Sequence, residues 1–384
     1  MRRRFLLAAL LMLTLPLQGC WNYREIESLS IVAGVAIDRG QEGHKYHLTL
    51  DIADTSGAGK DKPVKTTLLE CEGDTLFDAI RTASKTYGMR QFWQNCQVVV
   101  ISREVASESI LPVIDFLFRD AEPRLTMEVF ISEEETAKAI LETKPASMAI
   151  KSFELDKIYE QNEKLKPVAA YQRLYEIRNT LASSGQQLAL PSLRHVKSGE
   201  SMACELCGMS LFRGDHYAGS LSQEDSGYAM YVMDRAQGGI LNIKTPVGND
   251  IAALEVFENK TTVIPMVDDG GALRFVVHTQ TEVALGELDE TADVTSMELM
   301  NGFEAAAEMQ LKTEIERVVA LVQQTGLDIF GFGEMLHRSN PGAWYQVQDN
   351  WEEVFKTLPV EVSCRINFRN SGKSDKPVKV GGRR

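Results

Sequence analysis

Residues 1–20 decide where the rest of the chain can fold. Three arginines at positions 2 to 4 precede an uncharged run over residues 5–17, and Gln18, Gly19 and Cys20 follow it. A run of this length is too short to span a bilayer, which needs about 20 apolar residues, but it fits the central part of a signal peptide. A small residue and a cysteine after such a run form the pattern that lipoprotein-processing enzymes recognise. We therefore expect residues 1–19 to be removed.

The same pattern predicts a lipid on Cys20. Its thiol would receive a diacylglyceryl group, and a further acyl chain such as palmitate would complete an anchor that one chain alone does not provide. The alternative is an ordinary secretory signal with a coincidental cysteine. The lipid reading predicts a body held on the extracytoplasmic face of a membrane, with no cofactor other than the covalent lipid.

The charge of the chain excludes one class of partner. Its 384 residues hold 41 Lys and Arg against 54 Asp and Glu, and removal of the three arginines takes the formal net charge from −13 to −16. A nucleic-acid-binding protein normally shows a basic patch or stripe, so we expect no nucleic-acid partner. The length allows two or three domains whose cores need no disulfide framework. The spacing of the cysteines gives no pairing for Cys71, Cys96, Cys204, Cys207 and Cys364.

Residues 20–198 show alternating strand and helix patterns. Helices are expected after the capping residues Asp74, Ser102 and Ser132, the last with Glu135 in a capping box, and over residues 168–182. Residues 144–166 are polar and show no clean period. Strands are expected over residues 26–37, 46–52, 64–71, 96–101 and 125–131. This first region is therefore predicted to be α/β, with a boundary near Gly199.

Residues 199–370 begin with strand patterns and end with helix and strand. Closely spaced strands over residues 204–212, 228–233, 239–243, 252–266 and 272–285 suggest an antiparallel meander. Apolar residues then recur every three or four positions from Met300 to Val322, which predicts a helix that Gly326 ends. Residues 358–368 alternate as a strand, and the basic tail 371–384 is expected to be disordered. Taken together, these patterns predict an α+β fold in which helices pack on antiparallel or mixed sheets. They divide the chain into two sequence regions, which correspond to two or three structural domains.

No motif in the sequence makes a convincing active site. Cys204 and Cys207 have the spacing of a redox pair or half a zinc site, but they lie inside a predicted strand, and buried thiols or a local disulfide explain them better. Ser201 sits in a loose likeness of a nucleophile elbow, away from any strand-to-helix turn. We therefore predict no catalytic residue, no metal site and no enzyme activity.

Several stretches, taken in order, resemble the Ger(x)C family of spore-germination lipoproteins. Near the end of the chain the likeness is carried by Asp328, Phe330, Gly331, Phe332 and Gly333, then by Trp344, Trp351 and the segment 358–362. Earlier matching blocks are residues 20–27, 75–81, 114–120 and 206–219. The resemblance covers roughly residues 20–370, and the joint order of the blocks is more specific than any one of them.

The resemblance implies the non-catalytic C subunit of a nutrient germinant receptor on the outer face of the spore's inner membrane. Its partners would be an A subunit with large soluble parts and a multispan B subunit. The family is described with three mixed α/β domains. Its C subunit has no established ligand pocket, so the resemblance does not decide whether this chain binds a small molecule. We hypothesise that residues 328–333 with the two tryptophans shape a docking surface for a partner; packing of helix on sheet is the alternative for the tryptophan pair.

Two other classes of function compete with this reading. A solute-binding lipoprotein that feeds a transporter would have two lobes of similar size, crossing hinge strands and a tightly bound small molecule. A lipid-anchored hydrolase or thiol oxidoreductase would depend on Ser201, or on Cys204 and Cys207 with two reactive thiols of low pKa.

Overall fold

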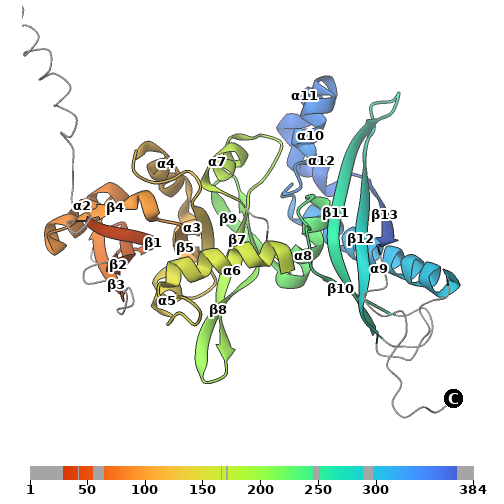
Figure 1. Ribbon diagram of the computed structural model, residues 1–384. Helices are drawn as coiled ribbons and strands as arrows, with labels where there is room; N and C mark the ends of the chain where they lie inside the picture. Colours follow the sequence, from red (N-terminus) through yellow and green to blue (C-terminus); the bar gives the residue numbers. More distant parts are fainter. Residues whose placement is uncertain are drawn as a thin grey trace, which may run out of the picture.

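The computed structural model describes residues 29–41, 43–54, 65–165, 167–169, 172–244, 251–288 and 297–369. The expected signal peptide, the lipid site Cys20, the first block of the family resemblance and the tail 371–384 lie outside these residues. Figure 1 shows two sheet-and-helix bodies side by side, with α6 (Lys151–Leu165) lying across one face of the first and ending near the second. None of the helices in the described part of the chain is long and apolar enough to cross a bilayer.

The first body is built on a nine-stranded mixed sheet. The strand order is β3-β2-β1-β5-β6-β7-β8-β9, and β4 pairs with β1. The pairs β1–β2, β2–β3, β7–β8 and β8–β9 are antiparallel, whereas β1, β5, β6 and β7 run parallel. The strands are β1 (Leu29–Arg39), β2 (Tyr46–Asp54), β3 (Lys65–Gly73), β4 (Arg90–Phe92), β5 (Val98–Ser102), β6 (Glu128–Ser132), β7 (Ala189–Ser198), β8 (Ser201–Arg213) and β9 (His216–Ser222).

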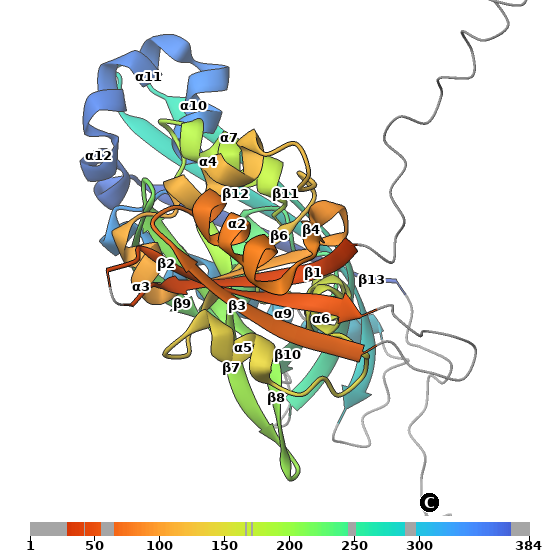
Figure 2. The same cartoon turned by 90° about the vertical axis from the view of Figure 1, so that its left-hand side faces the viewer.

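Helices cover both faces of this sheet, as Figure 2 shows from the side. In β5, Val99 and Ile101 point into a core shared with α2, α3, α4 and α7, while Val98 and Val100 point into one shared with α5 and α6. A central strand buried on both faces reads as a continuous apolar run. These helices are α2 (Leu76–Tyr87), α3 (Arg103–Glu108), α4 (Leu111–Arg119), α5 (Ala137–Glu142) and α7 (Leu174–Ala182), with a 3₁₀ turn η3 (Trp93–Asn95).

Three of the expected helix starts were misplaced, and α7 begins at Leu174 instead of residue 168. Ser102 caps α3 as expected, with its hydroxyl accepting a hydrogen bond from the amide of Val105. The cap of α2 is Thr75 instead of Asp74, and the cap of α5 is Thr136 instead of Ser132. The capping box at Ser132 is therefore wrong, because its hydroxyl instead closes the turn at the end of β6, accepting from the amide of Glu134 and donating to the carbonyl of Thr136.

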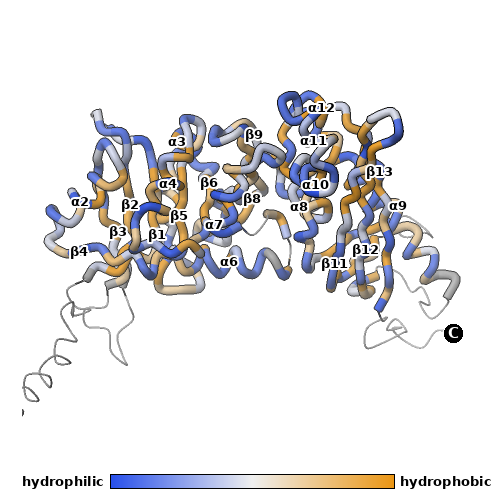
Figure 3. The backbone as a smooth tube through the Cα atoms, turned by 90° about the horizontal axis from the view of Figure 1, so that it is seen from above, coloured by the Kyte–Doolittle hydropathy of each residue, from blue (hydrophilic) through white to orange (hydrophobic). Residues whose placement is uncertain are grey.

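Helix α6 has no counterpart among the sequence predictions. Its inward side buries charged and polar residues, including Lys151, Ser152 and Glu154, so no apolar period marks the helix. The Nζ of Lys151 lies 2.7 Å from Oε2 of Glu154, and the other oxygen of Glu154 accepts the amides of Ala146 and Ser147. Figure 3 draws most of α6 in the hydrophilic colour, although it packs against both β1 and β8.

The second body is a four-stranded sheet in the order β10-β11-β12-β13. Strands β10 (Ile240–Lys244), β11 (Ile251–Val267) and β12 (Leu273–Leu288) form an antiparallel meander as expected. The strand expected at its start, over residues 204–212, instead belongs to β8 of the first sheet. Strand β13 (Val360–Phe368) pairs parallel to β12, because the intervening helices carry the chain back to the same end of the sheet. The strand expected over residues 228–233 is wrong: this apolar run belongs to α8 (Gln223–Val232), which Ser222 caps. Short apolar runs do not distinguish strand from buried helix.

The long helix α9 (Met297–Thr325) packs against this sheet. It confirms the helix predicted from the apolar repeat between Met300 and Val322. The Gln310 side chain bonds Asn242 O and Lys244 N on one edge strand, β10. Glu308 and Glu304 accept the amides of Ile366 and Phe368 on the other edge strand, β13. Side chains of one helix therefore hydrogen-bond to backbone groups of both edge strands, which leaves fewer of these groups free to pair with a strand of another chain.

The boundary expected near Gly199 lies in the tight turn between β7 and β8. Strand pairing within the first sheet continues across it, with Ser198 opposite Ser201. The change from one sheet to the other comes later, between β9 and β10, where α8 intervenes. The two sequence regions on either side of Gly199 therefore both contribute strands to the first sheet.

Candidate functional site

The residues expected near the end of the chain meet around the carboxylate of Asp328. It follows α9 and precedes a run of three short helices, α10 (Phe332–Ser339), α11 (Pro341–Val347) and α12 (Trp351–Thr357), with a 3₁₀ turn η4 (Gln348–Asn350). Oδ1 of Asp328 accepts the amides of Gly331 at 2.9 Å and Phe332 at 3.1 Å. Oδ2 accepts the amide of Gly333 at 2.8 Å and the indole Nε1 of Trp351 at 3.0 Å. The carboxylate thus holds the first turn of α10 and ties it to α12.

The environment of Asp328 makes its ionisation costly. The residue is 1% exposed, and burial raises the pKa of its carboxyl to about 6, although the four donated hydrogen bonds favour the charged form. No cation or second carboxylate contacts it among the described residues, so the arrangement offers a proton-binding group but no partner for acid–base chemistry. The geometry is that of a structural anchor.

Aromatic rings pack around this anchor. Phe332 stacks on Phe275 of β12 with ring centroids 4.7 Å apart and contacts Phe330 at 5.4 Å. The rings of Trp344 and Trp351 meet edge to face at 5.4 Å. All four predicted aromatic side chains are buried, the most exposed of them at 6%. The structure therefore brings the predicted residues together inside the molecule, where they can shape a surface only through the residues that they hold in place.

The surface above the anchor is a polar pocket of about 430 Å³. It is lined on one side by the loop before β7 and on the other by η4 and the start of α12. The backbone joins these parts: the amide of Gln187 donates to Asp328 O at 2.8 Å, and the amide of Glu334 donates to Gly185 O at 3.0 Å. The Arg213 guanidinium adds an ion pair to Glu352 at 2.9 Å. This corner thus connects the first sheet with the second body, and any partner bound here would contact both.

The cysteine pair lacks the features of a redox site. Cys204 Sγ lies 3.8 Å from Ile140 O, and Cys207 Sγ lies 3.4 Å from Ser192 O. All five cysteines in the described part of the chain are free thiols. Burial raises the pKa of Cys204, and it raises the pKa of Cys207 to about 11, so neither thiol is poised as a thiolate at neutral pH.

The other groups considered in the sequence are also dispersed. Ser201 is the exposed first residue of β8 and lies opposite Ser198. His195 on the neighbouring strand β7 lies opposite Cys204 and contacts Thr143 at 2.7 Å and the carboxylate of Glu134 at 3.4 Å. Within the described ranges there is no group of three His, Cys, Asp or Glu side chains able to hold a metal ion.

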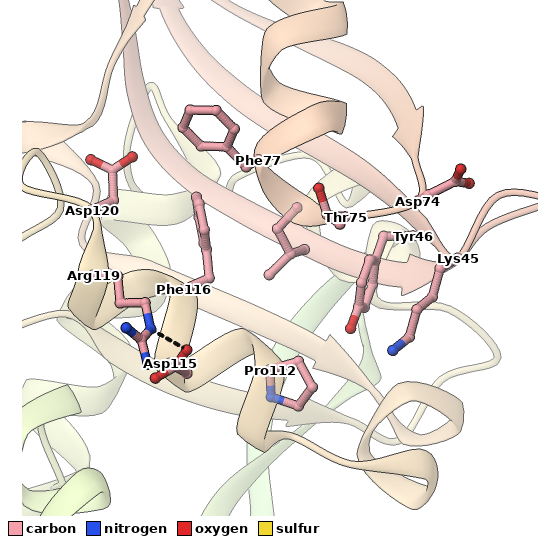
Figure 4. A pocket seen from close by; sticks show the side chains of 11 residues that line it. Lys45, Tyr46, Asp74, Thr75, Phe77, Pro112, Asp115, Phe116, Arg119 and Asp120 are labelled. Carbon is pink, nitrogen blue, oxygen red and sulfur yellow. Dashed lines mark hydrogen bonds and ion pairs between the residues drawn. The ribbon is translucent and has the colours of Figure 1, made fainter.

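A groove between α2 and α4 was not predicted from the sequence (Figure 4). It has a volume of about 470 Å³, and its lining comes from three segments that are distant in the chain: Lys45, Tyr46, Asp74, Thr75, Leu76, Phe77, Pro112, Asp115, Phe116, Arg119 and Asp120. Two of the blocks that resemble the Ger(x)C family, residues 75–81 and 114–120, meet here. Their joint appearance was the one signal in the sequence that pointed to this place.

Two family models for spore germination proteins match consecutive parts of the chain. The spore germination protein N-terminal domain matches residues 22–195, and the model described as spore germination B3/GerAC like, C-terminal, matches residues 207–372. The chain belongs to the Ger(x)C family of spore germination proteins. The resemblance read from the sequence is thereby confirmed.

Relatives from Bacillus subtilis (strain 168) match over nearly their whole length. Spore germination protein KC is 26% identical, over 99% of this chain and 98% of the relative. Spore germination protein B3 is 22% identical, over 94% of this chain and 96% of the relative. A solved structure, the crystal structure of the GerBC protein, aligns with a TM-score of 0.56 at 17% identity and covers 90% of this chain and 100% of that one. This likeness shows the shared fold and agrees with the α+β class expected from the sequence.

Proposed function

We propose that this protein is the lipid-anchored, non-catalytic C subunit of a spore nutrient germinant receptor, acting with A and B subunits on the outer face of the spore's inner membrane. The observation that carries the proposal is the family match over residues 22–195 and 207–372, with relatives that are themselves named spore germination proteins. The signal pattern ending at Cys20 supports the anchor.

The anchor has a physical purpose in such a complex. A lipid on Cys20 would restrict the body to the membrane surface and so raise its effective concentration near a membrane-embedded B subunit, without any new contact between the proteins. The formal charge of the chain, −13 and −16 without the three arginines of the signal peptide, gives no broad electrostatic attraction to an anionic membrane, so stable attachment requires the acyl chains.

For the docking of a partner we propose the corner above Asp328. Its exposed rim includes Asp349, Asn350 and Glu353, which are held by the buried anchor and by the packed ring of Trp351. Because the loop before β7 forms the opposite wall, a partner there would sense the relative position of both bodies. The rim is acidic, so we expect a basic or amide-rich partner segment.

The solute-binding alternative gains no support from the architecture. It requires two lobes of similar size with crossing hinge strands, whereas the described sheets have nine and four strands of different topology. The thiol oxidoreductase alternative conflicts with the raised pKa of Cys207.

The anchor and the assembly can be tested together on spore membranes. Tagged full-length protein is compared with Cys20→Ala and with the matched control Cys207→Ala, which removes a half-buried thiol from the body. We expect wild type and Cys207→Ala to be labelled by palmitate, to sediment with the inner membrane and to capture a multispan partner after mild detergent extraction. We expect Cys20→Ala to lose the label and the membrane association. Labelling and sedimentation of Cys20→Ala like wild type would contradict the anchor, and capture of no membrane partner by wild type would contradict the receptor complex.

A further inference from the structure

We propose that one edge of the first sheet lies against the membrane and contacts an anionic phospholipid surface. The surface, which we call the amino-edge patch, is formed by Met89, Arg124, Leu125, Tyr175 and Arg178. The inference rests on the proposed lipid anchor and goes beyond it, because it states which face of the anchored body meets the bilayer.

The amino-edge patch lies at the edge of the sheet where β1 begins. Strands β1, β4, β5 and β6 run parallel, so their amino ends point to the same edge. β4 pairs with the first residues of β1, with Leu29 opposite Arg90, and Figure 2 shows these two strands side by side. The amide of Tyr175 on α7 donates to Leu125 O at 3.2 Å. An ion pair between Arg90 and Glu122 joins β4 to the segment before β6. Three separate segments therefore meet at this edge.

The position of the lipid limits how the body can face the membrane. Nine steps along the chain connect Cys20 with Leu29, and at about 3.3 Å per residue they span at most about 30 Å. β1 has 11 residues, so the opposite edge of the sheet lies about 33 Å beyond Leu29. That edge could reach the bilayer only with a fully extended tether, whereas the amino edge needs no extension.

The amino-edge patch exposes side chains of the kind found at membrane interfaces. Met89, Leu125 and Tyr175 are 38%, 43% and 41% exposed. Tyrosine is enriched at the level of the lipid headgroups, because its ring is apolar and its hydroxyl is polar. Leucine and methionine lose contact with water when they enter the boundary between headgroups and acyl chains.

Arg124 and Arg178 supply positive charge to the same surface. Both are exposed, and in the described part of the chain neither guanidinium has a carboxylate within 4.0 Å. In the loop that leads to Arg124, Glu122 pairs with Arg90, and Asp120 accepts an amide hydrogen bond at 2.9 Å. Guanidinium groups bind phosphate through paired hydrogen bonds, so the two arginines suit the phosphate layer of a bilayer.

A polar pocket of about 340 Å³ continues the surface beside Arg124. Side-chain amides from residues 94–97 line it and would contact the polar headgroup layer. Its wall also includes the carboxyl groups of Glu128 and Asp156, which disfavour a phosphate inside the pocket. The lipid phosphates are therefore assigned to the exposed arginines.

The opposite edge of the sheet has acidic groups. Three glutamates at positions 133–135 directly follow β6, and Glu104 lies on α3 after β5. Glu104 and Glu135 are exposed and have no cation within 4.0 Å among the described residues. An anionic bilayer repels this edge and attracts the other one, which orients a body whose overall charge is negative.

The depth of a fluorescent label in the bilayer measures this orientation. The full mature lipoprotein is placed in vesicles of phosphatidylcholine and phosphatidylglycerol, with a fluorophore at Leu125→Cys, and brominated phospholipids quench labels that enter the interface. Interfacial side chains reach about 5–10 Å into the headgroup and acyl boundary, so we expect this label to lose about half of its emission or more. Glu135→Cys on the opposite edge is the matched control and should keep its emission. The unsubstituted chain measures background from the thiols of the body.

Variants locate the surface. Arg124→Glu combined with Leu125→Ser should reduce the quenching of a label at Tyr175→Cys about twofold or more, because charge and apolar contact are both lost. The matched control is Lys312→Glu combined with Met309→Ser at two exposed positions on α9, which should leave the quenching unchanged. Thermal unfolding of each variant verifies that it is folded.

Three results would overturn the proposal. They are equal quenching at Leu125→Cys and Glu135→Cys, no quenching at either position, and quenching at Tyr175→Cys that the patch variant leaves unchanged. A label at Leu125→Cys that is shielded only after a partner subunit is added would show that the occupant is a protein, and the membrane proposal would be wrong.

Mass spectrometry of the same samples separates this proposal from the proposed anchor. A lipid on Cys20 without quenching at Leu125→Cys contradicts only the orientation. A chain without a lipid contradicts the anchor, and with it the orientation that rests on it.

Discussion

The indole Nε1 of Trp351 donates a hydrogen bond to Oδ2 of Asp328 at 3.0 Å, across 23 residues of chain. This contact joins the turn after α9 to the first residue of α12, while three backbone amides complete the coordination of the same carboxylate. The position of α10 to α12 on the second sheet therefore depends on one buried acidic side chain.

Replacement of Asp328 by asparagine should destabilise the protein. Whichever way the amide is placed, its NH₂ group faces two N–H donors that the carboxylate now accepts, and buried donors without an acceptor cost about 1–3 kcal/mol. We expect Asp328→Asn to lower the free energy of unfolding by about 1–3 kcal/mol near pH 7, measured by urea denaturation. Trp351→Phe removes one donor and should cost less. Additive losses in the double variant would contradict the coupling of the two residues.

The stability difference between wild type and Asp328→Asn should depend on pH. The folded pKa of Asp328, about 6, lies above the usual value of 3.8, so the folded state binds a proton that the unfolded state has released. The stability that this group contributes is fully present at low pH and is lost as the pH rises through about 6. We therefore expect the gap between the two proteins to widen as the pH is lowered from about 7 to about 5. A gap that narrows would contradict the direction of the pKa shift.

Gly333 should be intolerant of a side chain. A Cβ at this position would lie 2.8 Å from Gly185 O and from atoms of both Trp344 and Trp351. We expect Gly333→Ala to cost about 1–3 kcal/mol through overpacking. The matched control is Gly342→Ala in the first turn of α11, where the nearest atom is 3.5 Å away, and this change should be neutral or slightly stabilising. Equal melting temperatures for the two variants would show that the corner is not tightly packed.

The buried ion pair in α6 should be sensitive to loss of one partner. The side chains of Lys151 and Glu154 are 2% and 5% exposed, so Lys151→Met leaves a buried carboxylate without its cation, at a cost of about 3–5 kcal/mol. Lys157→Met breaks an exposed pair with Glu160 and should cost less than about 1 kcal/mol. Urea denaturation of the two variants measures the difference, and similar small losses would argue against a dry environment around Lys151.

The thiols of the folded body should react slowly. Burial raises the pKa of Cys207 to about 11 and that of Cys96 to about 12, which leaves little thiolate at neutral pH. A chromogenic disulfide reagent should therefore react with Cys71, Cys96, Cys204, Cys207 and Cys364 mainly after denaturant is added. Rapid reaction of two thiols in the native protein would restore the oxidoreductase hypothesis.

Local patterns predicted the elements that bury apolar residues on a regular period. The continuous run in β5 and the repeat from Met300 to Val322 in α9 both follow from one kind of burial along the whole element. The same reasoning missed α6, because Lys151 and Glu154 occupy its buried side, and misassigned the run at Tyr228, because a short apolar segment suits helix and strand equally.

Of the two candidate sites, the sequence pointed to the residues around Asp328 but not to the groove between α2 and α4. Asp328 and its neighbours were found through a family resemblance, but their burial depends on contacts with Phe275 and Gly185, which lie far away in the sequence. The groove was missed because Lys45, Asp74 and Phe116 come from three segments, and none of them forms a motif alone. These residues come together only when β1 pairs with β2 and the helices pack on the resulting sheet.

The most direct test of the central claim is nutrient-triggered release of dipicolinic acid from spores that lack this protein, repeated with the wild-type chain restored and with Cys20→Ala restored. The account predicts loss of release for at least one nutrient on deletion, recovery with wild type, and failure of Cys20→Ala to restore it. Recovery with Cys20→Ala equal to that with wild type would contradict the anchored subunit, and unchanged release on deletion for every nutrient, in spores that have no other germinant receptor, would contradict a role in germination.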